Sequence, residues 1–307
     1  MLRLFTLACA ATAAAAALPP SPRVLRDVPY LGPGRREKLD LYLPAGGGAL
    51  RPALVWIHGG GLVSGNKRTK ANRNVAMDLA RAGEVVASID YRLGRGAWPQ
   101  DILDAKNAIR FLRSRAARYG VDPDRIAVGG GSSGGYLALM AALSPDSGRF
   151  DPGDHYPGVS NRVRAVLDFY GPADFTTRRK AGPGGLPTDQ PRPKMVDVPR
   201  VFGVTDGRDP VFRVASAVRY VRRGAPPVLI CQGRNDPQVD YLQAIELANL
   251  LKADGVPHQL VLLDGIGHAF DLETWRNRRL PEDLRPVVAN FLARYDGARA
   301  TAARRRI

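Results

Sequence analysis

Short apolar runs alternate with helical patterns along most of the chain. Residues 53–57 and 85–89 are continuous apolar runs, which are typical of strands buried on both faces of a parallel sheet. Residues 99–119 carry apolar side chains on one face of a long helix. Further strands are expected at 24–30, 36–43, 125–128, 163–170, 228–231 and 259–263, and further helices at 75–82, 133–143, 239–253 and 282–294. Repeated β-α-β units with short links predict a doubly wound, mostly parallel α/β sheet with helices on both faces.

One segment interrupts this alternation. Residues 176–211 are rich in Gly, Pro and Arg and show no regular period. A loop of this length is usually a lid, a binding loop or a disordered stretch. We therefore predict a single α/β domain over residues 18–300, with a lid-like insertion at 176–211 and a basic tail at 301–307.

The first residues have the pattern of a secretory signal. Met1-Leu2-Arg3 precedes an apolar stretch that ends in alanines at residue 17, and this stretch is too short to span a bilayer. Residues 1–17 are therefore expected to be a cleaved signal peptide, which predicts a secreted or periplasmic protein. Its removal would leave Cys231 as the sole cysteine, expected to be buried and free.

The chain is strongly basic. Lys and Arg number 45 against 29 Asp and Glu, which gives a formal charge of +16 over 307 residues. The basic residues are spread through helices, loops and both ends, whereas nucleic-acid binders usually gather them on one face with aromatic residues for stacking. A specific nucleic-acid partner is therefore not expected, although a basic surface of this kind attracts polyanions at low salt.

A strand, a glycine-rich corner and a helix follow one another at residues 126–138. The corner holds serine between glycines in the pattern G-x-S-x-G, a strained turn that exposes a nucleophile at the top of a sheet. Two registers fit this pattern, one centred on Ser132 and one on Ser133. The end of the preceding strand favours Ser132 as the nucleophile, with the backbone N–H of Ser133 directly after it.

A second glycine motif, His58-Gly59-Gly60-Gly61, directly follows the strand 53–57. Successive glycines let backbone N–H groups face a developing oxyanion, where one donor is worth about 10²–10³ in rate. We predict an oxyanion hole formed by the N–H groups of Gly60, Gly61 and Ser133. His58 precedes the glycines and is expected to support this loop rather than act as a base.

A serine nucleophile needs a base and an orienting acid, and in this type of fold they follow in the order Ser, Asp or Glu, His. His268 lies in the loop that leaves the carboxyl end of strand 259–263, where sheet enzymes place catalytic groups. The loop after strand 228–231 offers Asp236 as the acid. Asp240 is a second candidate, although it lies where the next helix begins and could serve there as an N-terminal charge.

Several motifs carry a resemblance to a known family: Leu39-Asp40-Leu41-Tyr42-Leu43-Pro44, Ile57-His58-Gly59-Gly60-Gly61, Asp90-Tyr91-Arg92-Leu93, the serine corner, Tyr170-Gly171-Pro172, Gly233 to Val239, and Gly267-His268. Through them the chain resembles the secreted carboxylesterases of the α/β-hydrolase superfamily, near hormone-sensitive-lipase-like enzymes and bacterial feruloyl and acetyl xylan esterases. The resemblance covers nearly all of the chain after residue 17. It implies Ser132, Asp236 and His268 as a catalytic triad, with Gly60, Gly61 and Ser133 as oxyanion donors.

Two departures refine this resemblance. Gly131 and Ser133 flank the candidate serine where lipase-like members often have Asp and Ala, so the chain is more similar to the feruloyl and acetyl esterases. The short segment before His58 leaves no room for a large N-terminal helical cap, so a small cap or none is expected. Four aspartates in the motifs and their surroundings are expected to brace the fold rather than to catalyse: Asp90, Asp101, Asp104 and Asp174.

The resulting hypothesis is hydrolysis of a carboxylic ester through an acyl-enzyme intermediate, without metal or cofactor. The expected substrates are small-molecule or carbohydrate esters, of short-acyl, acetyl or feruloyl type. An amide or formamide hydrolase or a peptidase on the same fold is one alternative. A non-catalytic protein that binds polyanions through its basic surface is an alternative of another class.

Overall fold

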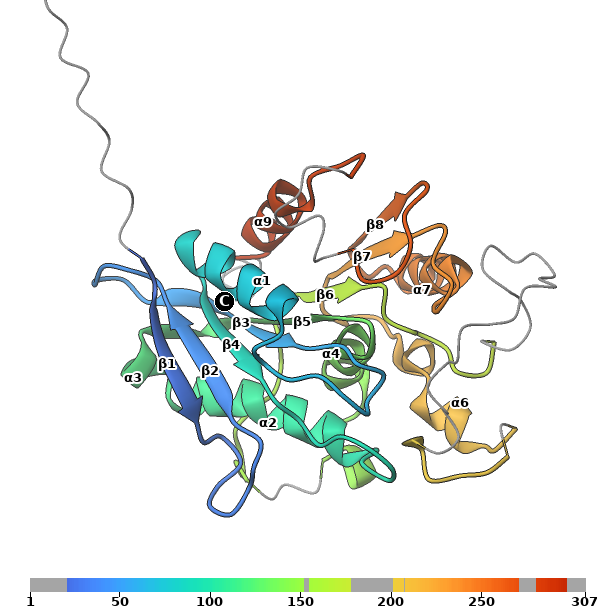
Figure 1. Cartoon of the computed structure of the whole chain (residues 1–307), viewed down its shortest axis with the longest axis horizontal. Coiled ribbons are helices and arrows are strands. Elements are labelled where there is room, and N and C mark those ends of the chain that lie inside the picture. Colours follow the sequence, from blue (N-terminus) through green and yellow to red (C-terminus); the bar gives the residue numbers. More distant parts are fainter. Residues whose placement is uncertain (1–20, 152–154, 178–200, 207, 271–279, 297–307) are drawn as a thin grey trace, which may run out of the picture.

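The computed structural model describes residues 21–151, 155–177, 201–206, 208–270 and 280–296 (Figure 1). The strands among these residues form one eight-stranded sheet in the order β1-β2-β4-β3-β5-β6-β7-β8. Their bounds are β1 Arg23–Val28, β2 Leu39–Leu43, β3 Arg51–Ile57, β4 Val85–Ile89, β5 Val121–Gly131, β6 Val166–Phe169, β7 Val228–Gly233 and β8 His258–Leu263. Strands β3 to β8 pair in parallel, and β1 and β2 add an antiparallel edge. The predicted mostly parallel sheet is confirmed.

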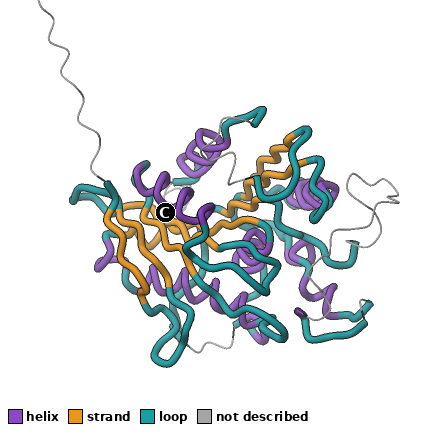
Figure 2. The backbone as a smooth tube through the Cα atoms, viewed as in Figure 1, coloured by secondary structure: helices purple, strands orange, loops and turns teal. Residues whose placement is uncertain are grey.

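Helices cover both faces of this sheet (Figure 2). They are α1 Lys70–Arg81, α2 Gln100–Ser114, α3 Ala116–Tyr119, α4 Ser133–Leu143, α6 Val211–Ala215, α7 Tyr241–Ala253 and α9 Leu284–Arg294, with short 3-10 turns at Gly148–Phe150 and Ala217–Tyr220. Strand β3 divides its side chains between two apolar clusters, because successive side chains of a strand point to opposite faces. Leu54 and Trp56 pack with α1 and α9. Val55 and Ile57 pack with α2, α4 and α7.

The predicted elements are found in order, and their bounds differ in instructive places. The bounds of β4 and α4 are those predicted. Helix α1 begins at Lys70, five residues early, because Thr69 caps it by accepting a hydrogen bond from the N–H of Asn72. The predicted helix 99–119 is divided at Arg115 into α2 and α3.

Three predicted segments fall largely or wholly outside the described residues. These are the signal peptide 1–17, the basic tail 301–307 and most of the insertion 176–211, of which residues 178–200 are not described. At the end of the insertion, Val201 and Phe202 are buried, and the carbonyl of Val201 accepts a hydrogen bond from the N–H of Gly96. Among the described residues, no helix combines the length and apolar character needed to cross a membrane.

The parallel register brings the carboxyl ends of the central strands to one edge of the sheet. Ile57 of β3 lies opposite Gly130 of β5, and Gly131 lies opposite Phe169 of β6. Gly233 of β7 lies opposite Leu263 of β8. The loops that leave β3, β5, β7 and β8 therefore start from the same edge, which is where open α/β sheets build their sites.

Candidate active site

Ser132 occupies the corner between β5 and α4. Its backbone has φ 57° and ψ −124°, a conformation that non-glycine residues rarely adopt and that is retained where the surrounding structure enforces it. The N–H of Ser132 donates to the carbonyl of Phe169 on the neighbouring strand at 2.8 Å. The corner is therefore fixed by its own sheet, and the serine hydroxyl projects from it.

Close packing against β3 requires glycine in this corner. A Cβ atom on Gly134 would lie 2.1 Å from the carbonyl oxygen of Ile57, which is far inside van der Waals contact. Any larger residue would push the first turn of α4 away from β3. The G-x-S-x-G pattern is thus explained by the approach of two backbones.

His268 joins the serine to a carboxylate. Its Nε2 atom lies 2.9 Å from Oγ of Ser132, and its Nδ1 atom lies 2.7 Å from Oδ2 of Asp236. A carboxylate can only accept, so Nδ1 carries the proton and Nε2 is left to accept from the serine hydroxyl. Tyr170 meets the ring edge-on, with the ring centroids 4.7 Å apart.

Asp236 is 1% exposed, and its carboxylate is surrounded by donors. Besides His268, Oδ2 accepts from Nε2 of Gln232 at 3.0 Å, and Oδ1 accepts from the N–H groups of Gln238 and Val239 at 2.8 and 3.0 Å. Hydrogen bonds of this number compensate the loss of water around a buried negative charge.

The sequence offers two candidates for the nucleophile, Ser132 and Ser133, and two for the acid, Asp236 and Asp240, and these take different positions in the structure. Ser133 is buried as the first residue of α4, with its hydroxyl 3.4 Å from the hydroxyl of Tyr91. Asp240 caps α7 by accepting from the N–H of Leu242 at 3.0 Å. The residues that meet at His268 are therefore Ser132 and Asp236.

The glycine loop after β3 passes directly beside the serine. A Cβ atom on Gly59 would lie 3.2 Å from the Cβ atom of Ser132. Gly60 has φ 126°, and a Cβ atom there would lie 2.0 Å from the carbonyl oxygen of Ser64. Only glycine can occupy that position, because both the dihedral angle and the space exclude a side chain. Helix α4 begins at Ser133, and its first N–H groups have no intrahelical acceptors. It packs closely at the start of the loop, since a Cβ atom on Gly134 would lie 2.8 Å from the carbonyl oxygen of His58.

His58 is buried beneath this loop. Its ring stacks on Tyr91 with centroids 4.4 Å apart, and its Nδ1 atom lies 2.7 Å from the carbonyl oxygen of Gly59. Burial lowers the pKa of His58, which keeps the ring neutral. The ring therefore contacts Tyr91 and the first glycine of the loop.

Sequence reasoning assigned no role to three residues around the site. Tyr170 packs on His268, Gln232 donates to Asp236, and Tyr91 donates from its hydroxyl to the carbonyl of His58 at 3.0 Å. Tyr170 directly follows β6, Gln232 is the penultimate residue of β7, and Tyr91 is the second residue after β4. Tyr91 and Tyr170 also lie in the motifs that carry the family resemblance, which is the signal that the sequence offers for them.

The four aspartates expected to brace the fold lie apart from the contact between Ser132 and His268. Asp104 accepts from Arg35 and Arg92, and Asp174 accepts from Thr176 and Ser216. Asp90 pairs with Lys67, and Asp101 is a buried carboxyl whose pKa burial raises to about 7.

Cys231 is buried and free. In the described part of the chain, His, Cys, Asp and Glu do not gather in groups that could hold a metal ion.

Comparison with known proteins identifies the family. Residues 39–251 match the family model described as BD-FAE. The chain belongs to the BD-FAE family. This BD-FAE chain is 36% identical to the probable carboxylic ester hydrolase LipM and 32% identical to the esterase LipQ, both of Mycobacterium tuberculosis. The matches cover 80% and 89% of this chain but only 56% and 64% of the relatives' length.

Solved structures place the BD-FAE chain in the α/β-hydrolase fold. A truncated carbohydrate esterase from gut microbiota superposes with a TM-score of 0.76 at 25% identity, covering 90% of this chain and 97% of that one. Native esterase 2 of Thermogutta terrifontis superposes with a TM-score of 0.65 at 26% identity, covering 90% and 91% of the two chains.

Proposed function

We propose that this chain hydrolyses carboxylic esters through a covalent acyl-enzyme on Ser132. One observation carries the proposal: the hydroxyl of Ser132, the ring of His268 and the carboxylate of Asp236 form a continuous relay at 2.9 and 2.7 Å. The names of the similar proteins, which include carboxylic ester hydrolases and esterases, support the same chemistry.

Each residue of the relay has a defined step. Oγ of Ser132 attacks the ester carbonyl carbon while Nε2 of His268 takes its proton, and Asp236 holds the ring and stabilises the imidazolium. The tetrahedral intermediate collapses as His268 returns the proton to the leaving alcohol. Water then repeats the sequence on the acyl-enzyme, with His268 again as base, and releases the carboxylic acid.

The oxyanion of each tetrahedral intermediate is bound by backbone N–H groups of Gly60, Gly61 and Ser133. Support for this assignment comes from the glycine loop beside Ser132 and from the helix N-terminus that begins at Ser133. The serine corner is hydrogen-bonded to β6 and the glycine loop to the segment after β4, so the backbone dipoles are oriented before the charge develops.

The substrate class proposed is short-acyl or carbohydrate-linked esters, including acetyl and feruloyl esters. Similar solved structures include a carbohydrate esterase, and esterase 2 of Thermogutta terrifontis with propionate or butyrate bound. Hydrolysis of the corresponding amides on the same relay is expected to be slower, because an amine is the poorer leaving group.

The test compares the purified protein with Ser132→Ala and Ser133→Ala on p-nitrophenyl esters of increasing acyl length, then on acetylated and feruloylated sugars and on matched anilides. Ser132→Ala should lower kcat on the order of 10⁶-fold, to background. Ser133→Ala keeps the backbone N–H and should lose about tenfold at most. Equal rates in the wild type and Ser132→Ala, or activity on anilides alone, would contradict the proposal.

A labelling experiment gives a second readout. Paraoxon phosphorylates esterase 2 of Thermogutta terrifontis. The same reagent should add one diethylphosphoryl group to the wild-type chain, with loss of p-nitrophenolate, and none to Ser132→Ala. Intact-protein mass spectrometry measures the adduct, and a label that persists in Ser132→Ala would assign the nucleophile elsewhere.

We also propose that the chain is exported after cleavage following residue 17. The charged start, the apolar stretch and the alanines before this point support export. Expression of the full chain in a bacterium and N-terminal analysis of the secreted or periplasmic fraction test it, and an uncleaved chain retained inside the cell would count against it.

A further inference from the structure

The connection between β3 and α1, residues 58–69, contains the proposed oxyanion donors and an unusual run of backbone conformations. Gly60, Gly61, Leu62 and Gly65 all have positive φ, with Leu62 at 65° although it carries a side chain. Glycine adopts positive φ at little cost, but for Leu62 this conformation is costly and persists only where the surrounding structure over-determines it. The connection therefore depends on contacts from outside for its shape.

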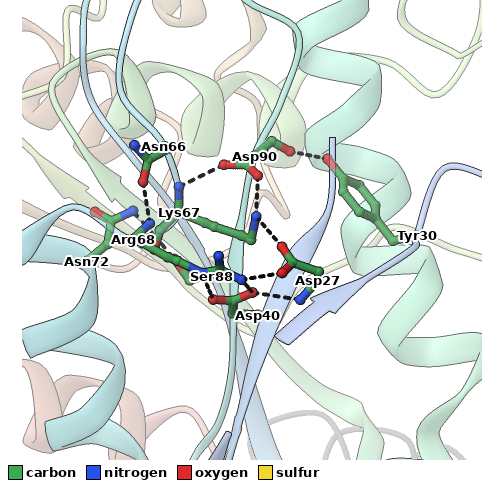
Figure 3. A network of polar contacts seen from close by, with 9 residues as sticks. All are labelled: Asp27, Tyr30, Asp40, Asn66, Lys67, Arg68, Asn72, Ser88 and Asp90. Atoms are coloured by element: carbon green, nitrogen blue, oxygen red, sulfur yellow. Dashed lines mark hydrogen bonds and ion pairs between the residues drawn. The ribbon is translucent and has the colours of Figure 1, made fainter. Parts of the chain in front are cut away.

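Lys67 supplies the most extensive of these contacts (Figure 3). Its Nζ atom lies 2.5 Å from Oδ2 of Asp90 and 3.1 Å from Oδ1 of Asp27. Its own N–H donates to Oδ1 of Asp90 at 2.8 Å, and its carbonyl accepts from the hydroxyl of Ser88 at 2.8 Å. Main chain and side chain of this one residue are thus both tied to the end of β4.

Arg68 continues the network to the antiparallel edge of the sheet. Its Nε and Nη2 atoms lie 2.6 and 3.0 Å from the two carboxylate oxygens of Asp40 on β2. Nη2 also lies 2.6 Å from Asp27 on β1, whose N–H donates to Asp40 at 2.9 Å. We call Asp27, Asp40, Lys67, Arg68 and Asp90 the loop clamp.

The segment after β4 holds the other end of the same connection. The hydroxyl of Tyr91 donates to the carbonyl of His58 at 3.0 Å, and the N–H of Gly94 donates to the carbonyl of Leu62 at 2.8 Å. Because Asp90 precedes Tyr91 directly, the anchor at Lys67 and the anchor at His58 share one rigid support. The glycine donors lie between these two anchors.

From this arrangement we propose that Lys67, through Asp90, is a positioning residue that sets the geometry of the glycine loop for oxyanion binding. The inference rests on the proposed function, in which Gly60 and Gly61 donate to the oxyanion. Lys67 is expected to act on the transition state and not on substrate affinity, because its side chain contacts two aspartates and is only 7% exposed.

The decisive variant is Lys67→Met, which keeps the length and apolar stem and removes the charge. Asp90 and Asp27 then lose their shared cation, and the connection loses its side-chain anchor. We expect kcat to fall about 10- to 100-fold, less than the loss of a whole oxyanion donor, with KM changed by about threefold at most.

Lys106→Met is the matched control. Lys106 is also buried, at 0% exposure, and its Nζ atom lies 3.0 Å from Oδ1 of Asp146. This ion pair lies at the far end of α4 from Ser132, roughly 16 Å along the helix. The control should lose stability as Lys67→Met does and keep kcat within about twofold of wild type.

A double-mutant cycle identifies the partner. Asp90→Asn retains an acceptor for the N–H of Lys67 and removes the opposing charge. If Lys67 acts through Asp90, the loss in kcat for the double variant should be smaller than the product of the two single losses. Independent, multiplicative losses would overturn the assignment to this pair. Lys67→Arg, whose side chain is slightly longer, should retain more kcat than Lys67→Met, because it keeps the cation.

Hydrogen exchange of the loop amides separates this inference from the proposed function. Lys67→Met should speed exchange in residues 59–65 at least tenfold, roughly 1.4 kcal/mol of local stability, while Lys106→Met should not. Unchanged loop exchange, or equal losses of kcat in Lys67→Met and Lys106→Met, would overturn the inference. If Ser132→Ala retained wild-type turnover, the proposed function would fail, and the exchange data would still decide the positioning by Lys67.

Discussion

Two buried aspartates on neighbouring parallel strands differ sharply in their surroundings. Asp168 lies within β6 and Asp236 lies three residues beyond β7, and they are 2% and 1% exposed. Asp168 accepts the N–H of Gly171 at 3.0 Å, and burial raises the pKa of its carboxyl to about 8. Asp236 accepts from Gln232, Gln238, Val239 and His268.

The comparison shows that the number of hydrogen-bond donors, and not the depth of burial, determines which role a buried carboxyl can take. Asp168 is packed so closely that Cβ atoms on Gly135 or Gly171 would lie 2.4 Å from its Oδ1 atom. With water excluded and one backbone donor, the neutral acid is the favoured form at pH 7. Asp236 is supplied with enough donors to serve as the acceptor that orients His268.

Asp236→Asn should have the largest effect of the variants that probe this comparison. The amide can present N–H to Nδ1 and favour the wrong tautomer of His268, so kcat should fall about 10³–10⁴-fold while the fold is retained. Asp168→Asn is the matched control, and its kcat at pH 6.5 should stay within about threefold of wild type. Steady-state kinetics on p-nitrophenyl acetate measures both, and similar losses in the two variants would remove the distinction.

Gln232→Met should have an intermediate effect. Nε2 of Gln232 donates to Asp236 at 3.0 Å and to the carbonyl of Val239 at 3.2 Å. Its removal takes one donor from the carbonyl of Val239 and leaves Asp236 with three, which costs about 1–3 kcal/mol of stability and loosens the carboxylate. We expect kcat to fall about 3- to 30-fold. Thermal melting and kcat should change together here, and an unaltered kcat would show that the three remaining donors hold Asp236.

Much of this arrangement could be predicted from the sequence, because local patterns encode it. Strand β4 is apolar except for Ser88 and is buried on both faces, so its bounds follow from the run 85–89 alone. The glycines around Ser132 predict a tight corner, and His268 and Asp236 each follow an apolar strand. The carboxyl ends of parallel strands lie at one edge of the sheet, so a residue that directly follows a strand can be placed at that edge from the sequence.

Other features depend on contacts that no local pattern reports. Ser132 and Ser133 both fit the glycine pattern, and apart from the end of the predicted strand, which favours Ser132, only the contact with His268 separates them. The loop clamp joins residues from Asp27 to Asp90 that lie on four separate segments, so spacing carries no signal for it. The carboxyl of Asp168 is buried in a strand between the apolar residues Leu167 and Phe169, and its raised pKa follows from packing that no local pattern reports.

The smallest expected effect is on the pH dependence of the free energy of unfolding. The pKa of Asp168 is raised in the folded state from 3.8 to about 8. Between these values the folded protein binds more protons than the unfolded chain, so wild-type stability falls as pH rises, by up to about 1.4 kcal/mol per unit. Asp168→Asn removes this slope, because an amide does not titrate.

From pH 5 to pH 8, the unfolding free energy of Asp168→Asn should therefore rise relative to that of the wild type by about 1–4 kcal/mol. Denaturant titrations across this range measure it, with the exposed Asp264→Asn as a control that should run parallel to wild type. A constant difference between Asp168→Asn and wild type would mean that Asp168 is charged when folded. Burial with one donor would then suffice for a carboxylate in this sheet, and the four donors of Asp236 would need another explanation.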